Sequence, residues 1–144
     1  MTTGHVDCIF LQHPKDEQIR QIVELYRAQG WWQANDDAKE DLVAKLIAGS
    51  QCFVLAMEDE TVVGMGRAIS DGISDAYIQD VTVRLDRRKQ GIGKMILRAL
   101  VDRLHEDGIF WIGLISEPGS AGLYKGAGFQ EMAGSIPMVM LKQR

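Results

Sequence analysis

Cysteine, histidine and proline are scarce in this 144-residue chain, with two, three and three copies. Cys8 and Cys52 each stand among apolar residues, a setting typical of buried free thiols. The histidines His5, His13 and His105 are scattered, and no Cys/His spacing of the kind that holds zinc occurs. We therefore expect two buried thiols and no metal site.

Long apolar runs and an excess of positive charge are also missing. No stretch approaches the roughly 20 apolar residues that a membrane-spanning helix needs. The opening residues MTTGHVDCIF lack the basic segment and long apolar run of a signal peptide, so the expected location is the cytoplasm. A net charge of −4 argues against a nucleic-acid-binding surface, which needs a cationic face.

The length of the chain is that of one domain, residues 1–144, and is sufficient to bury a core. Apolar residues recur at helical spacing in some segments and alternate in others. Strands are expected at residues 6–12, 52–58, 61–70, 73–85, 110–115, 129–132 and 137–142, and helices at 14–30, 36–49, 95–108 and 120–128. This order predicts an α/β (α+β) fold, with a mixed, mostly antiparallel sheet flanked by helices.

The segment RRKQGIGK, residues 87–94, places four cations around two glycines between an expected strand and an expected helix. The first turn of a helix leaves about four backbone N–H groups unpaired and carries a partial positive charge of ~0.5. Gly91 and Gly93 let a ligand approach that backbone closely, and Arg88 and Lys94 add charge. The segment predicts a site for a small anion, best a phosphate or pyrophosphate. A solvated glycine turn is the structural alternative.

Two common phosphate-binding patterns do not fit this junction. A P-loop, G-x-x-x-x-G-K-[ST], needs glycine where Arg88 stands and serine or threonine where Met95 stands. The dinucleotide-binding pattern G-x-G-x-x-G needs glycine or alanine where Ile96 stands.

A third pattern does fit, because the junction resembles the acetyl-coenzyme A loop of the GNAT N-acetyltransferase family. That loop reads [QR]-x-x-G-x-[GA] between a strand and a helix, and Arg88, Gly91 and Gly93 stand at its three fixed positions. The later segment PGSAGLYKGAGF, residues 118–129, resembles the F/L-Y-x-x-x-G-F segment of the same family. The resemblance extends from about residue 19 to 141 and implies the GNAT acyl-CoA N-acyltransferase fold.

The resemblance also implies a cofactor and an activity. Acetyl-CoA would bind with its pyrophosphate in the loop and its pantetheine arm along the preceding strand. The implied cofactor-binding residues are Val81, Thr82, Val83, Arg88, Lys89, Gln90, Gly91, Ile92, Gly93, Lys94 and Tyr124. The implied activity is transfer of the acetyl group to a primary amine of a small molecule, by direct attack in a ternary complex.

Tyr124 stands at the general-acid position of the family. A phenol, whose ordinary pKa is about 10, is suited to protonate a thiolate whose conjugate acid has a pKa of about 8.5. A tyrosine that only packs a helix is the structural alternative. The backbone N–H of Val81 or Val83 is the implied donor to the carbonyl oxygen.

The general base is less sharply indicated. Asp80 is the nearest carboxylate on the expected pantetheine strand, and it could take the amine proton directly or through water. Alternation predicts one face with Ile78, Asp80 and Thr82, and the other with Tyr77, Gln79 and Val81. Asp80 could instead pair with a nearby arginine, and Glu117 is a weaker candidate.

The acceptor amine is expected beside the loop after the first helix. Trp31 and Trp32 could form an apolar or cation–π wall, although at least one of them should be core. Arg67 would favour an acidic substrate group and Asp71 an amine, and Gln79 completes the substrate-binding set.

Other functions remain open at this point. A protein lysine or N-terminal acetyltransferase would use the same motifs, and so would a non-catalytic acyl-CoA-binding regulatory module. Exposed edge strands in the C-terminal half, together with family habit, predict a homodimer.

Overall fold

The computed structural model of the chain describes residues 4–33 and 39–142. In this part of the chain five strands form one sheet in the order β1-β2-β3-β4-β5. They are β1 (Asp7–Phe10), β2 (Cys52–Glu58), β3 (Thr61–Ser70), β4 (Asp75–Val83) and β5 (Trp111–Gly113). Neighbours from β1 to β4 are antiparallel, whereas β4 and β5 are parallel. The mixed, mostly antiparallel sheet is therefore confirmed.

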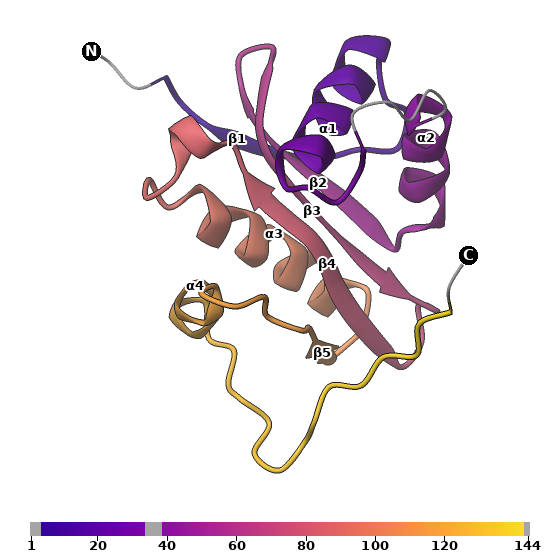
Figure 1. Cartoon of the computed structure of the whole chain (residues 1–144), viewed down its shortest axis with the longest axis vertical. Helices are drawn as coiled ribbons and strands as arrows, with labels where there is room; N and C mark the ends of the chain where they lie inside the picture. The colour runs from indigo at the N-terminus through magenta and orange to yellow at the C-terminus, as the bar shows by residue number, and fades with distance from the viewer. Residues whose placement is uncertain (1–3, 34–38, 143–144) are drawn as a thin grey trace.

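Helices cover both faces of the sheet (Figure 1). Helices α1 (Asp16–Ala28) and α2 (Lys39–Gly49) lie on one face, and α3 (Ile92–Glu106) lies on the other. A 3-10 turn (Leu85–Arg87) precedes α3. The short helix α4 (Ala121–Gly126) packs beside α3. Asn35 and Asp36, expected to begin the second helix, lie outside the described residues. None of the helices in the described part is long and apolar enough to cross a bilayer.

Two apolar cores hold these layers together. On one side Ile96, Leu97 and Leu100 of α3 are fully buried against the sheet. On the other side of the sheet, Ile22 of α1 and Phe53 of β2 are buried together with apolar residues of α2. The helical spacing in the sequence thus corresponds to real buried faces, which is how amphipathic helices are positioned on a sheet.

The two cysteines differ in burial. Cys52 is buried in β2, and burial raises the pKa of its thiol to about 11. Cys8 is free as well, but it is only half-buried, so the prediction of two buried thiols is wrong for Cys8.

A β-bulge interrupts β4 at Asp80. Met65 pairs with Thr82 and Arg67 pairs with Gln79, so Asp80 and Val81 together oppose the single residue Gly66. Asp80 has φ +60°, in the left-handed region that few non-glycine residues adopt. The alternation predicted for this strand is therefore wrong beyond Gln79, because the extra residue turns Asp80 to the same face as Gln79.

The two parallel strands separate just before this bulge. β5 pairs with β4 only through Asp75, Ala76 and Tyr77. From Ile78 onward the end of β4 has no strand partner on that side in the described chain. The sheet therefore opens between the end of β4 and the segment that follows β5.

The last two predicted strands, 129–132 and 137–142, are absent from the structure. Residues 130–142 are all exposed, and none of them forms a strand. Figure 1 shows this segment, in yellow, leaving α4 and running along the outside of the fold. The apolar residues that suggested strands are present, but a strand also needs a neighbour to bond with, and among the described residues no strand pairs with this segment.

Candidate active site

A groove of about 490 Å³ occupies the opening between β4 and the segment after β5. It is lined by ten of the eleven residues that the sequence assigned to acetyl-CoA: Val81, Thr82, Val83, Arg88, Lys89, Gly91, Ile92, Gly93, Lys94 and Tyr124. Gln90 is the exception, because its Oε1 accepts a hydrogen bond of 3.2 Å from Nε of Arg87. Ten of the residues implied by the resemblance thus line one groove, and their role in binding acetyl-CoA stays a prediction.

The backbone at the start of α3 faces the groove with unpaired donors. Gly91 precedes the helix with φ +81°. The first helical hydrogen bond is donated by Met95 to the carbonyl of Gly91, at 3.1 Å, so the N–H groups of the preceding first turn lack helical acceptors. A Cβ at Gly91 would meet no atom within 4 Å, so its backbone angle is the reason for glycine here.

Two arginines next to this turn have different partners. Nη2 of Arg87 lies 2.6 Å from Oε2 of Glu58, which ties the loop to β2. Nε of Arg88 donates to the carbonyl of Val83, at 3.2 Å, and the residue lines the groove. Arg88 and Lys94 therefore bring positive charge to the groove, and Arg87, which also lines it, anchors the loop.

Tyr124 reaches the groove from α4. Its ring is half-buried and meets Phe129 edge-on, with 6.2 Å between the ring centroids. Burial, and to a lesser degree the negative charge of Glu117, raise the pKa of the Tyr124 hydroxyl. The hydroxyl is thus kept protonated, which is the form that an acid catalyst requires.

A second cavity, of about 460 Å³, lies between α1, α2 and the sheet. The aromatic rings of Tyr26, Trp31 and Trp32 form one side, and Leu46 contributes apolar surface from α2. The rings of Tyr26 and Trp32 stack with 4.1 Å between centroids and 9° between planes. The two tryptophans are half-buried against the core, so each lines the cavity and also packs against the core.

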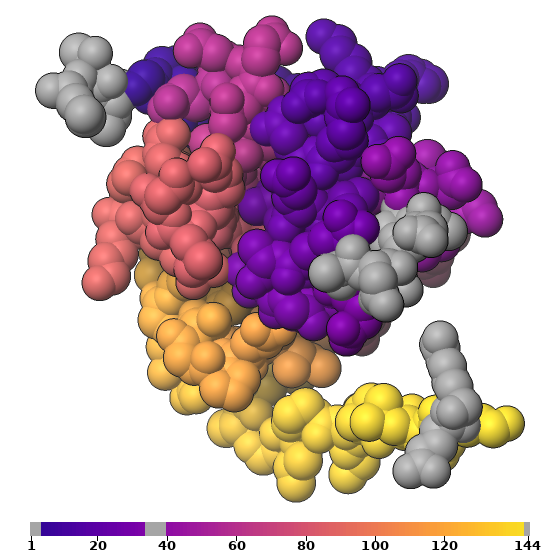
Figure 2. All heavy atoms as spheres, turned by 45° about the horizontal axis from the view of Figure 1, so that its top comes forward, coloured from indigo at the N-terminus to yellow at the C-terminus, as the bar shows by residue number. Residues whose placement is uncertain are grey.

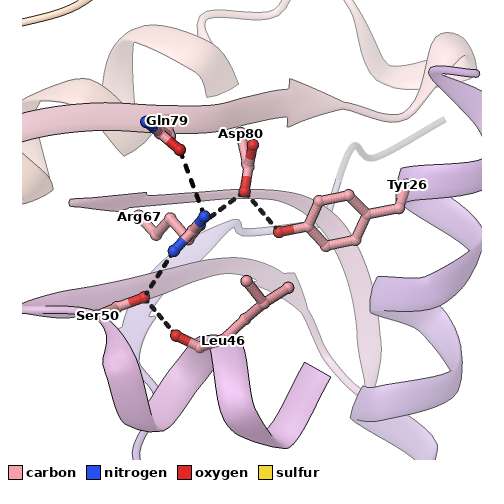
Figure 3. A network of polar contacts seen from close by, with 6 residues as sticks. All are labelled: Tyr26, Leu46, Ser50, Arg67, Gln79 and Asp80. Atoms are coloured by element: carbon pink, nitrogen blue, oxygen red, sulfur yellow. Dashed lines mark hydrogen bonds and ion pairs between the residues drawn. The ribbon is translucent and has the colours of Figure 1, made fainter. Parts of the chain in front are cut away.

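A polar network lies at the inner end of this second cavity (Figure 3). Oδ2 of Asp80 accepts hydrogen bonds from Nε of Arg67, at 2.6 Å, and from the Tyr26 hydroxyl, at 2.7 Å. Arg67 also donates to Oγ of Ser50, at 3.4 Å, and to Oε1 of Gln79, at 3.3 Å. Burial and the Asp80 carboxylate raise the pKa of Tyr26, so Tyr26 remains a donor. The arginine pairing offered as the structural alternative for Asp80 is therefore present.

Asp80 and Trp31 line both cavities. Nε1 of Trp31 donates to Oε1 of Glu117, at 3.1 Å, and so joins the loop after α1 to the segment after β5. The groove and the second cavity are therefore neighbours that share Asp80 and Trp31 in their walls.

Asp71 does not belong to this site. It lies in the exposed turn between β3 and β4, where Oδ1 accepts hydrogen bonds from the N–H groups of Ile73 and Ser74, at 2.8 and 3.0 Å. These two bonds lower the pKa of Asp71, with Ser74 the larger cause. Asp71 lines neither cavity, so the structure does not bring it together with the other predicted substrate-binding residues.

Several residues of the site escaped the sequence analysis. Tyr26 is buried on α1, and its hydroxyl, which no periodicity in the sequence indicates, connects it to Asp80. Lys45 lies in α2, and Ser50 directly follows its end. Both are far from β4 along the chain, so no local pattern indicated that they belong to this site. Over the described residues, no group of three or more histidine, cysteine, aspartate or glutamate side chains could hold a metal ion.

Comparison with known proteins agrees with this geometry. The Acetyltransferase (GNAT) family profile matches residues 15–129. An uncharacterized N-acetyltransferase from Pyropia yezoensis is 28% identical over 123 residues, covering 84% of this chain and 70% of the relative.

Two solved structures share the fold. A GNAT-family acetyltransferase from Streptococcus pneumoniae superposes with a TM-score of 0.78 and 22% identity, over 97% of this chain and 100% of the other. A predicted acetyltransferase from Clostridium acetobutylicum, solved with acetyl-CoA, has a TM-score of 0.70 and 18% identity, over 94% and 96%. Since the family profile covers most of its length, the chain belongs to the GNAT family of acetyl-CoA-dependent N-acetyltransferases.

Proposed function

We propose that the protein transfers the acetyl group of acetyl-CoA to the primary amine of a small molecule, with both substrates bound at once. The observation that carries the proposal is that Asp80 and Trp31 line both cavities. A thioester in the groove and an amine in the second cavity would come together there, and holding two reactants in contact supplies much of the acceleration of such a reaction.

The backbone that lines the groove is suited to bind acetyl-CoA. The unpaired N–H groups at the start of α3 are acceptable partners for a pyrophosphate, and Gly91 leaves the space beside them free. Arg88 and Lys94 would neutralise its charge, while Val81, Thr82 and Val83 would run beside the pantetheine arm. Gln90 is omitted from this set because it is bonded to Arg87.

The chemistry needs one proton to leave the amine and one to reach the sulfur. In the proposed reaction the amine nitrogen bonds to the carbonyl carbon, and the carbon–sulfur bond breaks. An amine that arrives as ammonium would first lose one proton to water. Tyr124 would then donate its proton to the departing sulfur, the attacking nitrogen would give its proton to Asp80, and exchange with water would return a proton to Tyr124. The backbone N–H of Val81 or Val83 would donate to the carbonyl oxygen as negative charge develops on it.

Asp80 is the proposed acceptor of the amine proton, directly or through water. Among the described residues its two hydrogen bonds both reach Oδ2, which leaves Oδ1 available to an amine. Its contacts with Arg67 and Tyr26 hold the carboxylate in position, so Asp80 would also orient the amine. Glu117 is the weaker candidate because it already accepts from Trp31.

The lining of the second cavity favours a small amine with a flat apolar body. Its volume of about 460 Å³ lies in the range of small-molecule sites. Tyr26, Trp31 and Trp32 offer aromatic faces, and Asp80 offers the charge that an ammonium group would meet at the inner end. Arg67 is engaged by Asp80, so we assign it to orienting that carboxylate. An aralkylamine is accordingly the first acceptor to test.

The experiment is thiol release from acetyl-CoA with a panel of amines. Phenethylamine represents the aralkylamines, and spermidine, an amino sugar and a lysine peptide represent the other classes. We expect kcat/KM to be highest for phenethylamine. Turnover of the lysine peptide alone would instead identify a protein acetyltransferase. Flat traces with every amine, combined with acetyl-CoA binding by calorimetry, would identify a non-catalytic binding module.

A further inference from the structure

The wall of the second cavity carries a cation that has no counter-charge. Among the described residues that line this cavity, the charged ones are Lys45, Arg67 and Asp80. Arg67 and Asp80 neutralise each other through the contact of 2.6 Å between Nε and Oδ2. Lys45 has no ion-pair or hydrogen-bond partner in the part of the chain that the structure describes. With two cations and one carboxylate, the described wall has a net charge of +1.

Lys45 belongs to the face of α2 that forms this wall. The α2 residues of the lining stand at positions i, i+3, i+4 and i+7, which is one side of a helix, and they are Leu42, Lys45, Leu46 and Gly49. Three of them are apolar or small, so Lys45 supplies the charge of this stripe. Figure 2 shows α2, in purple, at the molecular surface beside α1. Lys45 is exposed, and its ammonium group is therefore accessible to a ligand that enters the cavity from solvent.

Lys45 and the Asp80 carboxylate are separated along α2. Ser50, directly after α2, accepts a hydrogen bond of 3.4 Å from Arg67, which in turn holds Asp80 (Figure 3). Lys45 comes five residues before Ser50, which corresponds to roughly 7 Å along a helix axis. Helical side chains tilt toward the N-terminus of their helix, which is the direction away from Ser50. A ligand that reaches both charges must therefore carry its two polar ends on either side of its body.

A simple aralkylamine would match only part of this wall. Its amine would meet Asp80 and its ring would meet the aromatic side chains, but its positive charge would be added to a wall that is already positive. An amine with a carboxylate at the far end of its flat body has no net charge. Its carboxylate would meet Lys45, and hydrogen bonds between ionised groups are about twice as strong as those between neutral ones.

We propose that Lys45 determines the specificity of the second cavity, by selecting acceptor amines that carry an anionic group on the side of the flat body opposite the amine. The chemical class is an aromatic amino acid whose carboxylate is remote from its amine. Arg67 would not serve this purpose, because Asp80 engages it. The inference rests on the proposed acetyl transfer for its catalytic role, whereas ligand binding can be measured without turnover.

The experiment compares three amines built on one ring: phenethylamine, 4-(2-aminoethyl)benzoate and 4-(2-aminoethyl)benzamide. The benzamide has nearly the shape of the benzoate and lacks its charge. We expect kcat/KM with acetyl-CoA to be about tenfold higher for the benzoate than for the benzamide, which is the size typical of a hydrogen bond to a charged group. Equal values for these two amines would overturn the proposal.

Lys45→Met tests the residue itself, because it keeps an apolar stem and removes the charge. We expect kcat/KM to fall about tenfold for the benzoate. For phenethylamine it should rise by about two- to fivefold, because a repulsion between exposed charges is removed. A residue that only supports α2 would change both values in the same direction, and that result would also overturn the proposal. Lys15→Met is the matched control, since Lys15 is an exposed lysine before α1 that lines none of these cavities.

Calorimetry separates this inference from the proposed function. If none of the amines were acetylated, transfer to small amines would be refuted, and the dissociation constants of the benzoate and the benzamide would still test Lys45. Tighter binding of the benzoate, lost in Lys45→Met and kept in Lys15→Met, would support the assignment. Equal binding of the two ligands by the unmodified protein would refute it.

Discussion

Arg67 and Asp80 are not opposite one another in the sheet, yet Nε of Arg67 and Oδ2 of Asp80 lie 2.6 Å apart. The register pairs Arg67 with Gln79. The left-handed backbone of Asp80 adds one residue to β4 and turns the carboxylate toward α1, where Tyr26 also reaches it. One backbone irregularity thereby assembles the carboxylate, its arginine and its tyrosine at the junction of the two cavities.

Replacement of Asp80 by asparagine should lower both stability and turnover. The side chains of Arg67 and Asp80 are only 12% and 22% exposed, so the change leaves a poorly solvated guanidinium without its counter-charge. Breaking a buried ion pair costs about 3–5 kcal/mol, and we expect about 2 kcal/mol for this partly hydrated one. Urea unfolding measures the loss.

Asp86→Asn is the control for this substitution. Asp86 pairs with Arg84 at 2.9 Å, but these side chains are 63% and 43% exposed. Exposed pairs contribute about 0–1 kcal/mol, so little change is expected. Equal losses in the two variants would show that the Asp80 pairing has no special role in stability.

Removal of the Tyr124 hydroxyl should lower turnover and leave the affinity for acetyl-CoA nearly unchanged. General acids contribute typically 10²–10⁴-fold to rate, so Tyr124→Phe should reduce kcat by about 10²-fold or more. Its ring still packs against Phe129, and the acetyl-CoA dissociation constant should stay within about twofold by calorimetry. Tyr77→Phe, at an exposed tyrosine outside both cavities, should leave kcat unchanged. Full turnover by Tyr124→Phe would refute the acid role.

The dependence of kcat on pH should report the environment of Tyr124. Burial and Glu117 raise the pKa of its hydroxyl above the usual value of about 10. A raised pKa keeps the proton to higher pH, so kcat should fall only above about pH 10. Glu117→Gln removes one of the two causes and should move this fall to lower pH, while the glutamine can still accept from Trp31. A fall that does not move would mean that another group controls it.

Alanine at Gly91 should weaken acetyl-CoA binding beyond its effect on folding. The φ of +81° strains any residue with a Cβ by about 1–2 kcal/mol, and the added methyl group would stand where the proposed pyrophosphate lies. Gly108, at the other end of α3, has φ +83° and equally open surroundings, so Gly108→Ala is a matched control. Both variants should lose similar thermal stability, and only Gly91→Ala should lose acetyl-CoA affinity. Unchanged affinity in Gly91→Ala would count against the proposed cradle.

The groove was predictable because its signals are local in sequence. Gly91, Gly93 and the nearby cations follow a strand and begin a helix, and the physical consequences of such a junction do not depend on distant residues. The helical faces of α1 and α3 were predictable for the same reason, since their apolar spacing directly determines which side is buried.

The second cavity and the face of Asp80 were not predictable in this way. A left-handed residue other than glycine leaves no mark in the local sequence, because the surrounding ladder imposes it. The network around Asp80 joins Tyr26, Ser50 and Arg67, which come from three separate segments. The predicted strand at 137–142 is wrong for a different reason, since its composition favours a strand but no strand in the described part of the chain pairs with it.

Trp31 has a consequence for the thermodynamics of binding, because it forms part of the wall of both cavities and is bonded to Glu117 across them. A ligand that shifts this indole in one cavity changes the shape of the other. For the two proposed ligands the affinities would then be linked by one coupling free energy, and the factor by which acetyl-CoA alters amine affinity would equal the factor by which the amine alters acetyl-CoA affinity. Substituting Trp31 would therefore change the coupling free energy between the two ligands, which neither ligand measured alone would reveal.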